Sequence, residues 1–318
     1  MIKNFLKRFF PLAAICCLLF IILCGCREKA LYKDTRAMMG TFVEVISTDK
    51  NAPNIAFAEI SRIENLLSKY KEDSEIVKLN KFGKLKASPD TFYILEKTKE
   101  FWKLTDGAFD ISVGPLMDLW GFTDGKYRVP DKALVSRALE KVGADKIILN
   151  INDNMVKFKL HGMKLDLGGV AKGYALDCAV KKLKENGIKS CLINAGGQVY
   201  CLGDKFGKPW IVAAHSPRGK SFSGYLKLKD KSAATSGDYE QYFVSKNKRY
   251  CHIIDPRTGY PADSGVISVT VTAPDGLTAD VLSTSVFILG KEKGLALIKE
   301  FPGACVEIIE ESNVQDNP

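Results

Sequence analysis

Asp280 and Thr284 are the residues whose types and spacing point most directly to a metal ion. They stand four positions apart in residues 277–284, a stretch with helical character, so they would share one face of a helix. A carboxylate and a hydroxyl are hard oxygen ligands that suit Mg²⁺, which proteins often hold with one or two carboxylates together with substrate phosphates. An Asp that merely complements the dipole of a helix start explains the same pattern without a metal. The spacing alone leaves both interpretations open.

The glycine pair Gly168-Gly169 could bring a ligand close to the backbone. It lies in MKLDLGGVAKGY, residues 163–174, where an apolar strand-like run passes into a helix-like run. Glycine permits close approach of a ligand, and a helix start offers free N–H groups to a phosphate. Lys172 would add positive charge, and Asp166 could accept hydrogen bonds from a sugar or a base. The alternative is a tight turn with a surface lysine.

His252 is a candidate acid or base because it directly precedes strong turn chemistry in HIIDPRTGYP, residues 252–261. A single histidine beside a turn is, however, more often structural. Two further segments are ambiguous when taken alone. NAGGQ, residues 194–198, is a hairpin or loop signal, and GAFDISVGPLMDLWGF, residues 107–122, has aromatic rings that could pack a planar ligand or fill the core.

The overall composition is that of an ordinary globular protein. Of the 318 residues, 46% are apolar and 26% are charged, which excludes a disordered chain, a collagen-like chain and a polytopic membrane protein. The net charge of +9 arises from basic residues spread among acidic ones, so we expect no nucleic-acid partner. The sequence has no dinucleotide-binding G-x-G-x-x-G, P-loop, H-E-x-x-H or G-x-S-x-G motif, and its three histidines do not favour a multi-histidine metal centre.

The N-terminus predicts a bacterial lipoprotein signal. Basic residues precede an uncharged apolar run over residues 12–23, which is too short for a comfortable transmembrane span of about 20 residues. The run ends in LCGC, which resembles a lipobox with Cys26 as the cysteine that receives lipid, such as palmitate. We therefore expect a signal peptide over residues 1–25, a tether over residues 26–35 and a protein anchored on the extracytoplasmic face of the membrane. An ordinary secretory signal or an uncleaved anchor is the alternative.

The remaining cysteines of the mature chain show no C-x-x-C spacing, so a zinc site is not expected. We interpret them as structural, with one disulfide left open. They are Cys178, Cys191, Cys201, Cys251 and Cys305.

Residues 36–310 predict one continuous α+β domain, followed by a tail over residues 311–318. Strand and helix patterns are mixed without regular βαβ alternation, which disfavours a doubly wound sheet. The expected strands are residues 40–46, 147–151, 155–159, 190–194, 210–214, 222–228, 266–273 and 305–309. The expected helices are residues 53–70, 91–105, 131–142, 170–186, 278–289 and 291–300.

Several segments that are ambiguous alone become informative through their order along the chain. In sequence they are Met39-Gly40-Thr41, Tyr70 with Asp73-Ser74-Glu75, GAFDISVGPLMDLWGF, DLGGVAKGYALD, NAGG, ATSGDYE, HIIDPRTGYP and TADVLSTS. Together they resemble the ApbE-like family of FAD:protein FMN transferases over about residues 36–310. The resemblance implies a single ApbE-like, T-fold-related domain with mixed sheets and packed helices.

The resemblance also implies an activity. Such enzymes bind FAD, cleave its pyrophosphate with Mg²⁺ and transfer FMN to a threonine hydroxyl of an acceptor through a phosphoester bond, releasing AMP. The implied acceptors are flavoprotein subunits of membrane redox complexes with a motif like D-[GS]-x-T-[AS]-[TS]. The residues at FAD-contacting positions are Met39, Tyr70, Ala108, Phe109, Asp110, Asp166, Lys172 and Ile254. The residues at Mg²⁺-binding positions are Asp280 and Thr284 through side chains, and Gly169 and Ser283 through carbonyls.

Members of the family often have Pro-Thr where this chain has Ile111-Ser112, which puts that local loop in doubt. His252 is our candidate general base, with Asp255 as a lesser one. Two other functions stay open. An FAD pyrophosphatase would use the same site with water as acceptor, whereas a flavin-binding lipoprotein would bind without catalysis. The bulky Tyr70 favours transfer over hydrolysis, and the intact Asp280 and Thr284 pair argues against binding alone.

Overall fold

The structure, a computed structural model, describes residues 30–215, 217–218 and 222–311. Its compact unit begins at Tyr32. The expected signal peptide and Cys26 lie outside the described residues, as do residues 312–318 of the expected tail. In the described part of the chain, no helix combines the length and the apolar character needed to cross a membrane.

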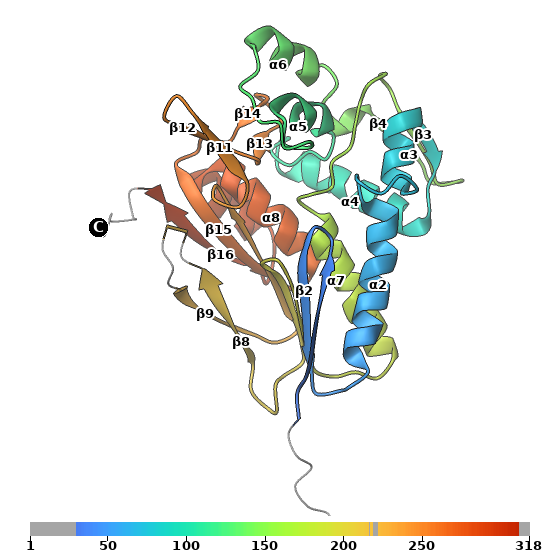
Figure 1. Cartoon of the computed structure of the whole chain (residues 1–318), viewed down its shortest axis with the longest axis vertical. Helices are drawn as coiled ribbons and strands as arrows, with labels where there is room; N and C mark the ends of the chain where they lie inside the picture. The colour runs from blue at the N-terminus through green and yellow to red at the C-terminus, as the bar shows by residue number, and fades with distance from the viewer. Residues whose placement is uncertain (1–29, 216, 219–221, 312–318) are drawn as a thin grey trace, which may run out of the picture. The chain divides into compact units, whose positions relative to one another are not determined.

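The largest sheet is antiparallel and has seven strands (Figure 1). Their spatial order is β1 Tyr32–Met38, β2 Thr41–Ser47, β6 Cys191–Ala195, β7 Gln198–Leu202, β10 Lys231–Gly237, β15 Val266–Ala273 and β16 Cys305–Glu310. Val43 and Val45 alternate with more exposed residues along β2 and are fully buried against the helices. Helices therefore cover this face of the sheet. The ends of the central strands β6 and β10 lie near the site.

Three long helices pack on one another and on this sheet (Figure 1). They are α2 Ala52–Leu67, α7 Ala171–Glu185 and α8 Gly276–Leu289. Helix α2 has Pro53 in its first turn, and helix α8 is N-capped by Asp275, whose side chain accepts the N–H of Thr278.

Helices α7 and α8 cross closely because glycines meet at the contact. A Cβ on Gly173 would lie 2.1 Å from the carbonyl oxygen of Gly276, which no real side chain permits. The start of α7, which follows the Gly168-Gly169 turn, is thus held directly against α8. This crossing brings two sequence segments that could carry chemistry into contact.

The remaining elements surround this framework. The helices are α3 Glu75–Phe82, α4 Pro89–Leu104, α5 Gly114–Trp120, α6 Lys132–Leu139 and α9 Lys291–Lys299, with a 3₁₀ turn at Ala144–Lys146. The small sheets are β3 Lys84–Lys86 with β5 Met155–Phe158 and β4 Ile147–Asn150, β8 Trp210–His215 with β9 Phe222–Leu228, β11 Tyr242–Ser245 with β12 Lys248–Cys251, and β13 Ile254–Asp255 with β14 Tyr260–Pro261.

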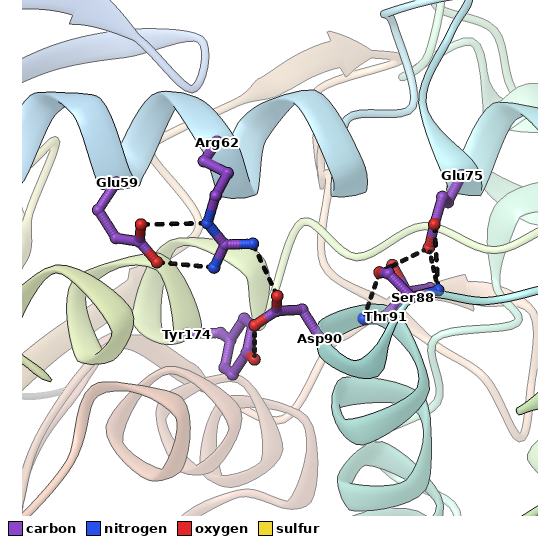
Figure 2. Close-up of polar contacts among 7 residues, drawn as sticks. All are labelled: Glu59, Arg62, Glu75, Ser88, Asp90, Thr91 and Tyr174. Carbon is purple, nitrogen blue, oxygen red and sulfur yellow. Dashed lines mark hydrogen bonds and ion pairs between the residues drawn. The ribbon is translucent and has the colours of Figure 1, made fainter. Parts of the chain in front are cut away.

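Figure 2 shows how α4 begins: the Ser88 hydroxyl accepts the N–H of Thr91, while Glu75 accepts two hydrogen bonds from the Ser88 N–H and hydroxyl.

Most of the expected elements form with shifted ends, and the α+β class is confirmed. The helix expected over residues 53–70 ends at Leu67, so Tyr70 lies in the following loop. Strand β1 includes residues 32–35, which the sequence pattern places in the tether. Its sequence YKDTRAM is largely exposed and lacks apolar alternation, and pairing with β2 holds it in the sheet. Helices α3 and α5, of eight and seven residues, were not predicted because they are too short for a clear periodic signal.

Candidate active site

One cavity brings together segments that are far apart in the sequence. Its walls come from the loop at residues 108–111, the Gly168-Gly169 turn, the start of α7, the end of β10, residues 252–254 with Pro256, and helix α8. Ten of the predicted site residues line it: Ala108, Phe109, Asp110, Asp166, Gly169, Lys172, His252, Ile254, Asp280 and Thr284. Apolar walls with a few converging polar groups are typical of a small-molecule site.

Met39, Tyr70 and Asp255 lie outside this lining. The backbone N–H of Met39 donates to Glu64 Oε1 at 2.7 Å, which fixes the turn between β1 and β2. Tyr70 is 67% exposed on the loop after α2. The Asp255 carboxylate accepts two hydrogen bonds from the Arg257 guanidinium, at 2.9 and 2.7 Å. That pairing does not favour Asp255 as the general base.

Asp280 and Thr284 both border the cavity from α8, as their spacing predicts. The Asp280 carboxylate is buried and accepts a hydrogen bond from the N–H of Gly173 at 3.0 Å. Burial raises the pKa of this carboxyl, while the positive charge of Lys172 and the hydrogen bond act in the opposite direction. A buried carboxylate with so little compensation favours a cation beside it.

The groups around Asp280 fit Mg²⁺. Thr284 supplies a hydroxyl, and a Cβ on Gly169 would lie 3.2 Å from Thr284 Oγ1, so the backbone of Gly169 lies next to that oxygen. Ser283 does not line the cavity, and its hydroxyl donates to the carbonyl of Asp280 at 2.9 Å. Within the described residues, no group of three or more His, Cys, Asp or Glu could hold a metal. One carboxylate with neutral oxygens is a donor set that substrate phosphates would complete around Mg²⁺.

A mostly buried ion pair borders the cavity at Asp166. Lys69 Nζ lies 2.6 Å from Asp166 Oδ2, with side-chain exposures of 17% and 8%. Asp166 Oδ1 accepts the N–H of Gly168 at 2.9 Å. The same ammonium lies 5.1 Å from the centre of the Tyr70 ring. One cation therefore connects the aromatic loop after α2 to the glycine turn.

His252 contributes to the cavity wall as a neutral imidazole. Burial lowers its pKa to about 4, and the hydrogen bond to Gln241 opposes that shift. His252 Nδ1 lies 3.1 Å from the carbonyl oxygen of Gln241. Because a carbonyl can only accept, Nδ1 carries the proton and Nε2 keeps its lone pair. At neutral pH the ring is therefore neutral and can accept a proton at Nε2.

Asp110 holds the loop at residues 108–112 in place. Its Oδ1 accepts the N–H and hydroxyl of Ser112 at 2.7 and 2.6 Å, and its Oδ2 accepts the N–H of Ala144 at 2.9 Å. Burial raises the pKa of this carboxyl, and the three hydrogen bonds oppose the shift. The Ile111-Ser112 departure is thus accommodated, since the Ser112 hydroxyl binds the carboxylate.

Comparison with known proteins assigns the chain to a family. A model described as the ApbE family matches residues 39–308. The chain belongs to the ApbE family. A FAD:protein FMN transferase of Klebsiella pneumoniae is 32% identical over 280 residues, covering 86% of this chain and 87% of the relative. One of Haemophilus influenzae is 34% identical over 261 residues, covering 78% and 75%.

Solved structures of ApbE proteins share the fold. A crystal structure of the ApbE protein from Thermotoga maritima superposes with a TM-score of 0.83 at 36% identity, covering 90% of this chain and 96% of that one. The flavin transferase ApbE from Vibrio cholerae gives a TM-score of 0.79 at 27% identity, covering 91% and 95%. The resemblance drawn from the ordered motifs is confirmed.

Several cavity residues of this ApbE chain were not singled out from the sequence. Ser236 and Glu240 line the cavity, and so does Gly196. All three stand in the motifs ATSGDYE and NAGG, so the signal was present at the level of the segment. Lys69 had no such signal, because its partner Asp166 is 97 positions away and their contact exists only in the folded chain.

Proposed function

We propose that the protein transfers FMN from FAD to a threonine hydroxyl of an acceptor protein, forming a phosphoester bond and releasing AMP. The observation that carries this proposal is the meeting of the Asp280 and Thr284 oxygens, Lys172 and the neutral His252 in one cavity. Phosphoryl transfer needs neutralised charge on the phosphate oxygens, and attack by a hydroxyl needs a proton acceptor. The names of the relatives, FAD:protein FMN transferase, support the same reaction.

The cavity offers a surface for each part of FAD. Phe109 and Ile254 provide an apolar wall for the flavin ring. Asp166 can accept hydrogen bonds beside it. Lys172, in the first turn of α7, and the positive dipole end of that helix suit the pyrophosphate. Binding in this orientation would bring the pyrophosphate toward α8.

The chain's own groups account for the bond changes. Asp280, Thr284 and the backbone at Gly169 and Ser283 would hold Mg²⁺, which neutralises negative charge on the phosphate oxygens when bound. The threonine oxygen bonds to the FMN phosphorus as the bond from that phosphorus to the bridging oxygen breaks, and AMP leaves with the bridging oxygen. His252 Nε2 takes the threonine proton.

Incubation with FAD, Mg²⁺ and a peptide carrying D-[GS]-x-T-[AS]-[TS] tests the proposal. Mass spectrometry should find flavin covalently bound to the peptide threonine, with one AMP released for each flavin. AMP and FMN without the adduct would establish an FAD pyrophosphatase instead. FAD binding with neither product would establish a flavin-binding protein.

His252→Ala tests the assigned proton acceptor. The variant should bind FAD with little change and lose most of its transfer rate, because general base catalysis typically contributes about 10²–10⁴-fold. Full transfer by a variant that binds FAD normally would contradict the assignment.

We further propose that lipid on Cys26 anchors the protein at the extracytoplasmic face, where subunits of membrane redox complexes are its acceptors. Since β1 begins at Tyr32, residues 27–31 would be the whole tether and could span about 17 Å when extended. Cys26→Ser should move the protein from the membrane fraction to the soluble extracytoplasmic fraction. Membrane retention of the variant would contradict the lipid anchor.

A further inference from the structure

Ser236 on β10 connects the cavity to the two hydroxyls of α8. Its Oγ lies 2.9 Å from Ser283 Oγ and 3.3 Å from Thr284 Oγ1, and the residue itself lines the cavity. Strand β10 and helix α8 are packed together, so these contacts belong to the framework of the fold. Three hydroxyls in a row raise the question of which oxygen donates to which.

The backbone decides the direction of this chain of hydrogen bonds. Ser283 Oγ lies 2.9 Å from the carbonyl oxygen of Asp280, and a carbonyl can only accept, so the Ser283 proton is used there. The bond between Ser236 and Ser283 must then be donated by Ser236. With its proton committed, Ser236 can only accept from Thr284. The protons therefore point from Thr284 through Ser236 and Ser283 to the backbone.

This direction leaves the Thr284 oxygen prepared for a cation. A hydroxyl binds a metal through its lone pairs, and its proton must point away. Here the Thr284 proton is turned toward Ser236, while the backbone of Gly169 lies next to the oxygen and has no Cβ to occupy the space. Partners that orient a metal ligand typically change metal affinity about 10–100-fold when they are removed.

We infer that Ser236 is a positioning residue that orients the Thr284 hydroxyl for a divalent cation. The chain of hydrogen bonds from Thr284 through Ser236 to Ser283 is called the relay below. This inference rests on the proposed metal-dependent function. It assigns Ser283 a role through its side chain in addition to the predicted role of its carbonyl. It also explains why a serine in the ATSGDYE segment borders the same cavity as the α8 ligands.

Mn²⁺ binding, followed by the electron paramagnetic resonance signal of the free ion in the presence of ADP, tests the relay without turnover. Ser236→Ala should weaken Mn²⁺ binding about tenfold or more, and Ser283→Ala should weaken it in the same direction. The double variant should lose less than the product of the two single effects, because both break one relay. Ser285→Ala is the matched control, since it removes a buried hydroxyl of α8 that donates to the carbonyl of Val281 outside the relay. It should bind Mn²⁺ as the wild type does.

Thermal unfolding of each variant separates loss of the relay from loss of the fold. Unchanged Mn²⁺ affinity in a folded Ser236→Ala protein would overturn the inference. Weakened binding in Ser236→Ala with full binding in Ser283→Ala would also overturn it, because Ser236 would then act as a direct ligand. Absence of bound Mn²⁺ in the wild type would instead contradict the metal dependence of the proposed function.

Discussion

The Lys69 ammonium lies 2.6 Å from the Asp166 carboxylate and 5.1 Å from the centre of the Tyr70 ring. Asp166 in turn accepts a hydrogen bond from the N–H of Gly168. The ion pair therefore links the loop after α2 to the turn that leads into α7. Removal of one partner of a largely buried pair leaves the other charge uncompensated, at a cost of about 3 kcal/mol.

Lys69→Met should weaken both the fold and FAD binding. We expect a lower thermal midpoint and an FAD dissociation constant raised about tenfold, measured by flavin fluorescence, because the Asp166 carboxylate and the aromatic loop lose their common anchor. Adding Asp166→Asn should restore much of the stability without restoring FAD affinity. Lys97→Met, which removes an exposed pair with Glu100 on α4, is the control. An unchanged FAD dissociation constant in Lys69→Met would show that the pair serves only the fold.

Asp280→Asn should separate activity from stability. The buried Asp280 carboxylate has a raised pKa because of burial, and asparagine can still accept the N–H of Gly173 without placing a charge there. We expect AMP release to fall at least about 100-fold, since the metal contributes several kcal/mol to the transition state. The thermal midpoint without metal should be equal or higher, and the increase that Mg²⁺ gives the wild type should disappear.

An exposed carboxylate gives the matched comparison for that variant. Asp263 pairs with Lys248 on the surface, so Asp263→Asn should leave AMP release and the Mg²⁺-dependent increase unchanged. If Asp280→Asn kept wild-type activity, the assignment of Asp280 as a metal ligand would be wrong.

The network in Figure 2 ties α2, α4 and α7 together outside the cavity. Asp90 accepts one hydrogen bond from Arg62 at 2.7 Å and one from the Tyr174 hydroxyl at 2.6 Å, while Arg62 also pairs with Glu59. Hydrogen bonds to charged groups each contribute about 1.5–3 kcal/mol when they are well formed. Asp90→Ala should therefore lower the free energy of unfolding by about 2 kcal/mol in urea titrations and leave the FAD dissociation constant unchanged. A large change in FAD affinity would mean that this network also shapes the cavity.

The sequence predicted the parts of the molecule whose signals are local. The two strands expected over residues 147–151 and 155–159 form β4 and β5, and the shared placement of Asp280 and Thr284 follows from helical spacing. The cavity itself could be anticipated only by the family resemblance, because its walls come from distant segments. Even so, the resemblance placed nine residues in its lining, and His252 was added as the candidate base.

The parts that escaped prediction depend on tertiary contacts. Strand β1 is an exposed edge strand, and pairing with β2 defines it better than its own pattern does. The pairing of Lys69 with Asp166 and the relay from Thr284 through Ser236 join residues from different elements. No spacing rule connects such residues, so the direction of their hydrogen bonds could be derived only from the folded backbone.

His252 makes the stability of the protein depend on pH in a predictable direction. Its pKa is lowered to about 4 by burial, against 6.5 in an unfolded chain. Between pH 6.5 and 4 the unfolded chain binds a proton at this site that the folded protein does not bind. Lowering the pH through this window therefore favours unfolding, by roughly 1.4 kcal/mol per pH unit and about 3 kcal/mol in total.

His252→Gln should remove this contribution. In urea titrations at pH 7, 5.5 and 4, we expect the wild type to lose about 3 kcal/mol more than the variant between the first and last pH. His161→Gln, which changes an exposed histidine, is the control and should follow the wild type. Equal pH dependence in the wild type and His252→Gln would mean that folding does not lower the pKa of this imidazole. In that case Nε2 would carry a proton below pH 6.5 and could accept the threonine proton only above that pH.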